Sequence, residues 1–147
     1  MNVFFGRRYR LCASHRLFCP EWDELRNRET FGKCANPYGH GHNYTVEVLV
    51  GGAPDPVTGM VMDLVELDAA VAREVLEPFD HTNLNLHSEF AGRVPTSENF
   101  CIAIFERLAR ALPGNALRQV RVEETPNNFF TYTGGQAAPG SKGYGTR

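Results

Sequence analysis

The sequence is poor in cysteine, and its cysteines form no disulfide framework. The four cysteines, at positions 12, 19, 34 and 101, include no C-x-x-C pair. Such usage is typical of a chain that keeps its thiols reduced, which predicts a cytoplasmic protein. The sequence also lacks any run of about 18 apolar residues, so we expect no membrane span. The N-terminal residues lack the apolar stretch of a signal peptide.

The chain carries little excess charge, with a formal net charge of -2. This balance gives no electrostatic reason to expect nucleic acid or an acidic membrane surface as a partner. No G-x-G-x-x-G motif follows a predicted strand, so no nicotinamide cofactor is expected. The length of 147 residues and the apolar content of 42% indicate one globular domain with a substantial core. We place that domain at 1–134, and the Gly- and Pro-rich residues 135–147 are predicted to form a flexible tail.

Hydrophobic periodicity predicts five extended segments and two principal helices. The strands are expected over 3–14, 43–50, 57–62, 117–124 and 128–133, and the helices over 64–77, stopped by Pro78, and from 95 to 113. A short helix is expected over 21–26, and 79–87 is expected to be a loop. The segments 43–50 and 57–62 flank a Gly- and Pro-rich turn and would form an antiparallel hairpin. This grouping predicts an α+β fold, with an antiparallel sheet and both helices on one face. Open sheet edges would invite pairing with another subunit.

Two histidines separated by one residue precede the 43–50 strand. If His40 and His42 already have strand geometry, their side chains point to the same face and form half of a typical zinc site. The candidate third ligand is His15, near the end of the first strand. Three histidines that leave one coordination position open are typical of a catalytic zinc. Cys34 could close the site as a fourth ligand, or it could stand outside as a reactive thiolate; a strand start at the surface is the simpler alternative for the histidine pair.

Two further places in the sequence carry acidic groups that could take part in chemistry. Asp80 lies beside His81, and a histidine oriented by a carboxylate is a common general acid or base. The alternative is an aspartate that caps a turn. Glu123 and Glu124 lie near a strand end, where one of the two should face inward and needs a partner, because burying an unpaired carboxylate is costly. A ligand with a guanidine-like edge could supply that partner, and so could an arginine of the chain.

Six segments, taken together and in order, resemble the 6-pyruvoyl-tetrahydropterin synthase family from about residue 5 to residue 134. They are 13–17, 32–44, 55–64, 80–84, 96–99 and 124–128. The resemblance implies a T-fold subunit, in which a four-stranded antiparallel sheet carries two helices on one side. It also implies that three subunits close a barrel and that two trimers stack as a homohexamer.

The resemblance also assigns roles to individual residues. Zinc would be held by His15, His40 and His42, and the general base would be Cys34. A second proton-transfer pair, Asp80 and His81, would complete a catalytic triad with that cysteine. Glu124 would anchor the pterin, and the pterin pocket would include Thr96, Ser97 and Glu98, which otherwise form a capped helix start.

The implied reaction is a carbon-oxygen lyase step of tetrahydrobiopterin biosynthesis. Its substrate would be 7,8-dihydroneopterin triphosphate, which would lose triphosphate and become 6-pyruvoyl-tetrahydropterin. The alternative product is that of the related 6-carboxy-tetrahydropterin synthases of the queuosine pathway. The six positions from Cys34 to His40, with Asn36 and Pro37 between, favour the pyruvoyl type. A non-catalytic zinc-stabilised module is a third possibility. The triphosphate could be bound by Arg8, Arg10, Arg16 or Lys33, and the sequence does not choose among them.

Overall fold

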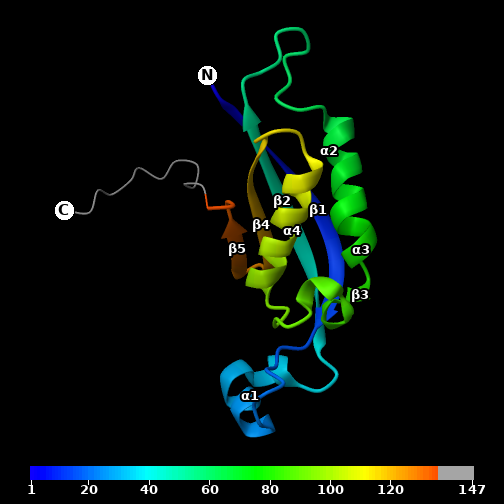
Figure 1. The fold of residues 1–147 in the computed structure, drawn as a ribbon, viewed down its shortest axis with the longest axis vertical. Helices are drawn as coiled ribbons and strands as arrows, with labels where there is room; N and C mark the ends of the chain where they lie inside the picture. The colour runs from blue at the N-terminus through cyan, green and yellow to red at the C-terminus, as the bar shows by residue number, and fades with distance from the viewer. Residues whose placement is uncertain (136–147) are drawn as a thin grey trace, which may run out of the picture.

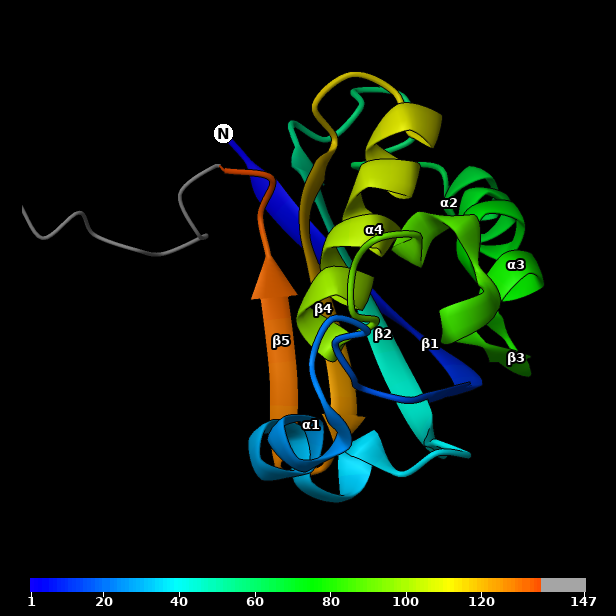
Figure 2. The ribbon, with the colours of Figure 1, turned by 60° about the horizontal axis from the view of Figure 1, so that its bottom comes forward.

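The computed structural model describes residues 1–135, which fold into one sheet with its long helices on a single face (Figures 1 and 2). The sheet has five strands in the order β3-β1-β2-β4-β5. The strands are β1 (Val3–His15), β2 (His40–Gly52), β3 (Thr82–Asn83), β4 (Leu117–Thr125) and β5 (Asn128–Tyr132). The helices are α1 (Glu24–Phe31), α2 (Leu64–Val71), α3 (Glu77–Phe79) and α4 (Ser97–Ala111). The α+β class is therefore confirmed.

The longest pairing in the sheet joins β1 to β2 in antiparallel fashion. Its register runs from Val3 opposite Gly52 to His15 opposite His40. The other edge of β2 pairs with β4. Because both edges of β2 are occupied, no edge remains for the strand predicted over 57–62, and that prediction and its hairpin are wrong. The segment is instead a loop in which the Asp55 carboxylate accepts hydrogen bonds from the next residues of its turn.

The expected sheet of four antiparallel strands is also corrected by the structure. Residues Thr82–Asn83, predicted as loop, form β3 and pair in parallel with Ala13 and Ser14 of β1. A two-residue strand carries no readable periodicity, which is why the sequence did not reveal it. Since β3 covers only this end of β1, most of the outer edge of β1 has no strand partner within residues 1–135.

The first long helical segment begins where predicted but continues past its predicted end. Asp63 caps α2 by accepting a hydrogen bond from the Val65 amide at 2.8 Å. A π-helical stretch, Ala72–Leu76, joins α2 to α3, so helical structure runs through Pro78 to Phe79. Pro78 has no N–H for the Glu74 carbonyl four residues earlier. The Arg107 Nε of α4 donates to that carbonyl at 2.8 Å instead, so the acceptor that Pro78 leaves free is satisfied.

The core lies between the sheet and the helices. Odd-numbered residues of β1 and even-numbered residues of β2 face α2 and α4, as the alternation of a strand requires. Fully buried side chains of β2 and β4 meet the apolar side of α4, which is formed by Phe100, Ile104 and Leu108. This packing fixes the ends of β1 and β2 relative to the start of α4.

The short helix expected over 21–26 lies further along the chain. Asp23 caps α1, which runs from Glu24 to Phe31 and lies beyond the end of the sheet where β1 ends and β2 begins (Figure 1). A 3-10 turn, Gly32–Ala35, then leads towards β2. No helix within residues 1–135 is long and apolar enough to cross a membrane. The predicted tail, 135–147, lies outside the described residues except for its first residue.

Candidate active site

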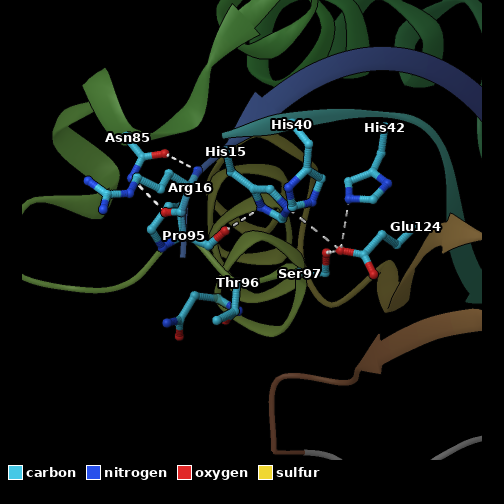
Figure 3. A network of polar contacts seen from close by, with 10 residues as sticks. His15, Arg16, His40, His42, Asn85, Pro95, Thr96, Ser97 and Glu124 are labelled. Carbon is cyan, nitrogen blue, oxygen red and sulfur yellow. Dashed lines mark hydrogen bonds and ion pairs between the residues drawn. The ribbon is translucent and has the colours of Figure 1, made fainter. Parts of the chain in front are cut away.

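The three predicted histidines meet where β1 ends and β2 begins. His15 is the last residue of β1 and His40 the first of β2, and the two are direct partners in the antiparallel register. His42 lies two residues further on the same face of β2, towards the helices. Two strand ends therefore bring together residues that are 25 positions apart in the sequence (Figure 3).

The imidazoles are close enough to share one ion. The Nε2 atoms of His15 and His40 are 3.2 Å apart, and the possible ligand atoms of all three rings lie within 4.8 Å of one another. The rings are edge-on to each other, with centroids separated by 4.7 to 5.2 Å. This is a cluster that could hold a metal ion, as the sequence predicted.

The hydrogen bonds around the cluster fit a metal site. His15 Nδ1 lies 2.8 Å from the Pro95 carbonyl, which can only accept, so Nδ1 carries the hydrogen and Nε2 is left with a free lone pair. His42 Nε2 is buried and has no hydrogen-bond partner in the part of the chain that the structure describes. Burial lowers the pKa of both His15 and His42, which favours the neutral imidazole that binds metal.

A glycine makes the approach to His40 possible. Gly39 has a φ of +67°, and a Cβ placed there would lie 2.5 Å from the carbonyl oxygen of His15. Any larger residue would both strain the backbone and push the two strand ends apart. The glycine before His40 is thus required by the close packing of the chain around the site.

One carboxylate of the predicted pair reaches this cluster. Glu124 Oε1 lies 3.6 Å from His42 Nε2 and 3.9 Å from His15 Nε2, and Ser97 Oγ donates a hydrogen bond to it at 2.7 Å (Figure 3). Glu123 points to the opposite face of the sheet, where it lies 3.6 Å from Arg121. Strand register therefore places Glu124, and not Glu123, at the site.

The three residues at the start of α4 have different surroundings. Ser97 is buried and contacts Glu124, whereas Thr96 is the N-cap, whose hydroxyl accepts from the Asn99 amide at 3.2 Å. Glu98 is exposed in the first turn of α4. Of these three candidates, Ser97 is the one whose side chain contacts Glu124 within residues 1–135.

Cys34 lies near the cluster but is not part of it. The thiol belongs to the Gly32–Ala35 turn and is half-buried. Burial raises its pKa, and the negative charge of Glu124 raises it further. The metal-binding cluster found within residues 1–135 consists of the three histidines without this cysteine. The geometry thus favours a thiol beside the site over a fourth ligand.

Asp80 and His81 form a pair, as predicted, but the pair lies beside Cys12 and not in the histidine cluster. Asp80 Oδ1 is 3.0 Å from His81 Nδ1 and accepts the Cys12 amide at 2.8 Å. These hydrogen bonds, that of Cys12 first, lower the pKa of Asp80 and keep it ionised. The His81 ring is 81% exposed, and its backbone has a φ of +58°. No contact in the described part of the chain joins the pair to Cys34 or to the histidines.

Two groups that hold the chain around the site were not predicted. The Pro95 carbonyl orients His15, and the Asn85 side chain binds both backbone groups of the next residue, Arg16. Asn85 Oδ1 accepts from Arg16 N at 2.7 Å, and Asn85 Nδ2 donates to Arg16 O at 2.9 Å. These contacts span 69 to 80 positions in the sequence, so no local pattern could have revealed them.

Comparisons with known proteins point to one family. Residues 5–135 match the family model described as 6-pyruvoyl tetrahydropterin synthase. The chain is 44% identical over 130 residues to the human 6-pyruvoyl tetrahydrobiopterin synthase, which covers 88% of this chain and 90% of the human one. A solved structure of the Caenorhabditis elegans 6-pyruvoyl tetrahydropterin synthase superposes with a TM-score of 0.86 at 43% identity, covering 91% of this chain and 96% of that chain.

A shorter match is to a protein with a different name. A protein of Archaeoglobus fulgidus, provisionally named 6-carboxy-5,6,7,8-tetrahydropterin synthase, is 44% identical over 90 residues. The match covers 61% of this chain and 71% of the archaeal one.

Proposed function

Because the chain belongs to the 6-pyruvoyl tetrahydropterin synthase family, we propose that it converts 7,8-dihydroneopterin triphosphate into 6-pyruvoyl-tetrahydropterin and releases triphosphate. The observation that carries the proposal is the convergence of His15, His40 and His42 beside the Glu124 carboxylate. A metal-binding cluster and a pterin anchor side by side suit a substrate with a ring at one end and a hydroxylated chain at the other.

Zinc is the metal that we propose for the three histidines. Imidazole ligands suit this ion, and three of them leave a coordination position for substrate. The lone pair of His15 Nε2, which points towards His40, and His42 Nε2, which has no hydrogen-bond partner within residues 1–135, are both available to it. When bound, zinc supplies Lewis-acid polarisation of the side-chain oxygens of the substrate.

Cys34 is the general base in this proposal. As a thiolate it would take a proton from a side-chain carbon of the substrate. Its burial and the charge of Glu124 raise its pKa in the protein without metal, so the thiolate needs a nearby positive charge to form. The half-buried position of the thiol next to the cluster fits this requirement.

Glu124 is proposed to anchor the pterin ring. An ionised carboxylate accepts two parallel hydrogen bonds from an amino group and a ring N–H, which gives orientation as well as affinity. Ser97 holds the carboxylate at 2.7 Å and so fixes the direction in which it accepts.

The Asp80–His81 pair is proposed to return a proton to the substrate skeleton. The ionised aspartate orients the ring through Nδ1, which leaves Nε2 for the substrate. The pair lies beside Cys12 at the outer edge of β1, and within residues 1–135 no hydrogen bond or ion pair joins it to Cys34. A complete triad therefore requires the pair of one copy to meet the Cys34 of a neighbouring copy.

Such neighbours follow from the free edges of the sheet. The outer edge of β1 before Cys12 and the outer edge of β5 have no strand partner within residues 1–135. We propose that β1 of one copy pairs with β5 of the next, that three copies close a barrel, and that two such trimers form a homohexamer.

Product analysis tests the function directly. Purified protein with about one zinc per chain, incubated with 7,8-dihydroneopterin triphosphate, should yield triphosphate and a product with the mass of 6-pyruvoyl-tetrahydropterin. His42→Ala should lose zinc and turnover together. Turnover that survives in metal-free protein would contradict the proposal.

The second candidate is the 6-carboxy product. It is favoured by the similarity to the Archaeoglobus fulgidus protein. The same mass measurement decides between the two, because the carboxy and pyruvoyl products differ in side-chain length.

A further inference from the structure

The turn that carries Cys34 is held against the residues that follow His15. Leu17 N donates a hydrogen bond to the Cys34 carbonyl at 2.8 Å. Arg16 Nε donates to the Ala35 carbonyl at 3.0 Å. Consecutive residues at the exit of β1 thus bind two consecutive carbonyls of the thiol-bearing turn.

Asn85 holds the same exit segment from the other side. Its carboxamide accepts from Arg16 N and donates to Arg16 O, so it satisfies both backbone groups of this residue (Figure 3). Asn85 follows β3, which pairs with Ala13 and Ser14 of β1. The side chain therefore continues the β3–β1 pairing for one residue beyond the strand, in place of a peptide group.

We propose that Asn85 and Arg16 are positioning residues that fix the Cys34 thiol relative to the histidine cluster. The chain of contacts runs from the Asn85 amide to the Arg16 backbone, and from the Arg16 guanidinium to the turn at Ala35. The proposal rests on the proposed function for one point, the role of the thiol as a base. We call the contacts of Asn85 with Arg16, and of Arg16 with Ala35, the brace. A displacement of about 1 Å at a reacting group costs on the order of 100-fold in rate, so the brace has a large effect on turnover.

The metal cluster does not depend on this brace. The His15 ring is held by the Pro95 carbonyl, and its backbone lies opposite His40 in the β1–β2 register. Removing the brace should therefore move the thiol and leave the three imidazoles in place. This separation distinguishes positioning of Cys34 from a general loosening of the site.

Arg16 is also one of the cations that could bind the triphosphate. In the structure its guanidinium is engaged at Nε with the Ala35 carbonyl and stacks 4.3 Å from the centroid of the Phe18 ring. Lysine keeps the charge that a phosphate contact needs, but it has no planar Nε–H to reach Ala35 and no plane to stack. Arg16→Lys therefore separates the two roles.

The kinetic test uses zinc-loaded enzyme carrying Asn85→Ala or Arg16→Lys. Both variants should keep about one zinc per chain and a KM within about threefold of the wild type, while kcat falls by tenfold or more. Leu86→Ala, an exposed neighbour in the same turn, and Arg28→Lys, on α1, are the matched controls and should leave kcat unchanged. Loss of zinc in Asn85→Ala, or a raised KM with normal kcat in Arg16→Lys, would overturn the proposal.

A second measurement does not need turnover. The rate at which iodoacetamide modifies Cys34, followed across pH by peptide mass spectrometry, reports the surroundings of the thiol. Both brace variants should change this pH profile, and both controls should reproduce that of the wild type. Unchanged profiles in Asn85→Ala and Arg16→Lys would overturn the positioning role of these two residues, even if the enzyme is active. If the wild type fails to turn over the pterin substrate, the proposed function fails while this profile still decides the positioning role.

Discussion

Protonation of the buried imidazoles sets how the site responds to pH. Burial lowers the pKa of His15 and His42 below the ordinary value of 6.5. The unfolded chain therefore binds protons at a higher pH than the folded chain, and folding stability is lost as pH falls through about 6.5. We expect the free energy of unfolding of the metal-free protein, and the zinc content of the loaded protein, to fall between pH 7.5 and pH 5. Urea unfolding and metal analysis across this range would check both, and a zinc content that stays constant to pH 5 would contradict the assignment.

The two adjacent glutamates provide a matched pair of variants. Glu124 faces the histidines and is held by Ser97, whereas Glu123 faces the opposite side of the sheet near Arg121. Loss of a charge-assisted hydrogen bond costs about 1.5–3 kcal/mol, or roughly 10- to 150-fold in binding. Glu124→Gln should therefore lower kcat/KM by about that factor, while Glu123→Gln should stay close to the wild type. Equal losses of kcat/KM in the two variants would mean that the strand register does not make Glu124 the residue that anchors the pterin.

For single residues, the sequence predicted which side chains belong to the site better than it predicted their contacts. The spacing of His40 and His42 predicted two imidazoles on one face, and the structure has them so. The choice between Glu123 and Glu124 needed the strand register. The Pro95 carbonyl and the Asn85 amide contribute through backbone position or long-range contact, and neither leaves a signal in the local pattern.

Among the elements, the junction of the π-helical stretch with α3 depends on one side chain of α4. Arg107 donates to the Glu74 carbonyl that Pro78 leaves free, and its guanidinium also pairs with Glu74 and Glu89. Arg107→Ala would leave these groups unpaired and should lower the free energy of unfolding by about 2 kcal/mol. Arg110→Ala, on the exposed side of the same helix, is the control and should have little effect. Urea unfolding of the two variants measures the difference, and similar losses would contradict a specific role for Arg107.

Elements with a long periodic pattern were predicted well, and elements that depend on distant partners were not. The apolar positions of α4 repeat over four turns, and its buried side is the predicted one. The 57–62 segment is apolar enough for a strand, but β1 and β4 already occupy both edges of β2. β3 exists only because its two residues lie beside β1. Pairing partners, and not local composition, decided these two cases.

For the whole molecule, the free edges of the sheet predict an assembly. Phe129 of β5 is 57% exposed on the open face of the sheet, next to an unpaired edge. If β5 pairs with β1 of another copy, a charge there should weaken the contact. We expect Phe129→Asp to shift the protein from hexamer to smaller species in sedimentation velocity. Val57→Asp, at a residue 91% exposed in the 53–63 loop, is the control and should leave the assembly unchanged. A wild type that sediments as a monomer would contradict the assembly.

The separation of Cys34 from Asp80–His81 within one chain leads to a test that only an oligomer can pass. If each site takes its thiol from one copy and its acid–imidazole pair from another, Cys34→Ala and His81→Ala chains should complement each other. Each variant alone has no intact site, but after unfolding and refolding together at equal amounts, about one quarter of the sites would combine an intact thiol with an intact imidazole. The mixture should then recover about a quarter of the wild-type activity per chain.

The control for this experiment mixes the double variant, Cys34→Ala with His81→Ala, with wild-type chains under the same conditions. A site that spans two chains keeps about one quarter of its activity in that mixture, whereas a site within one chain keeps about one half. In the first mixture a site within one chain recovers nothing, because every chain lacks one of the two groups. The two mixtures thus give opposite rankings for the two arrangements. Because Asp80 and His81 bind Cys12 where the unpaired part of the outer β1 edge begins, the shared site is the outcome that we expect from the fold.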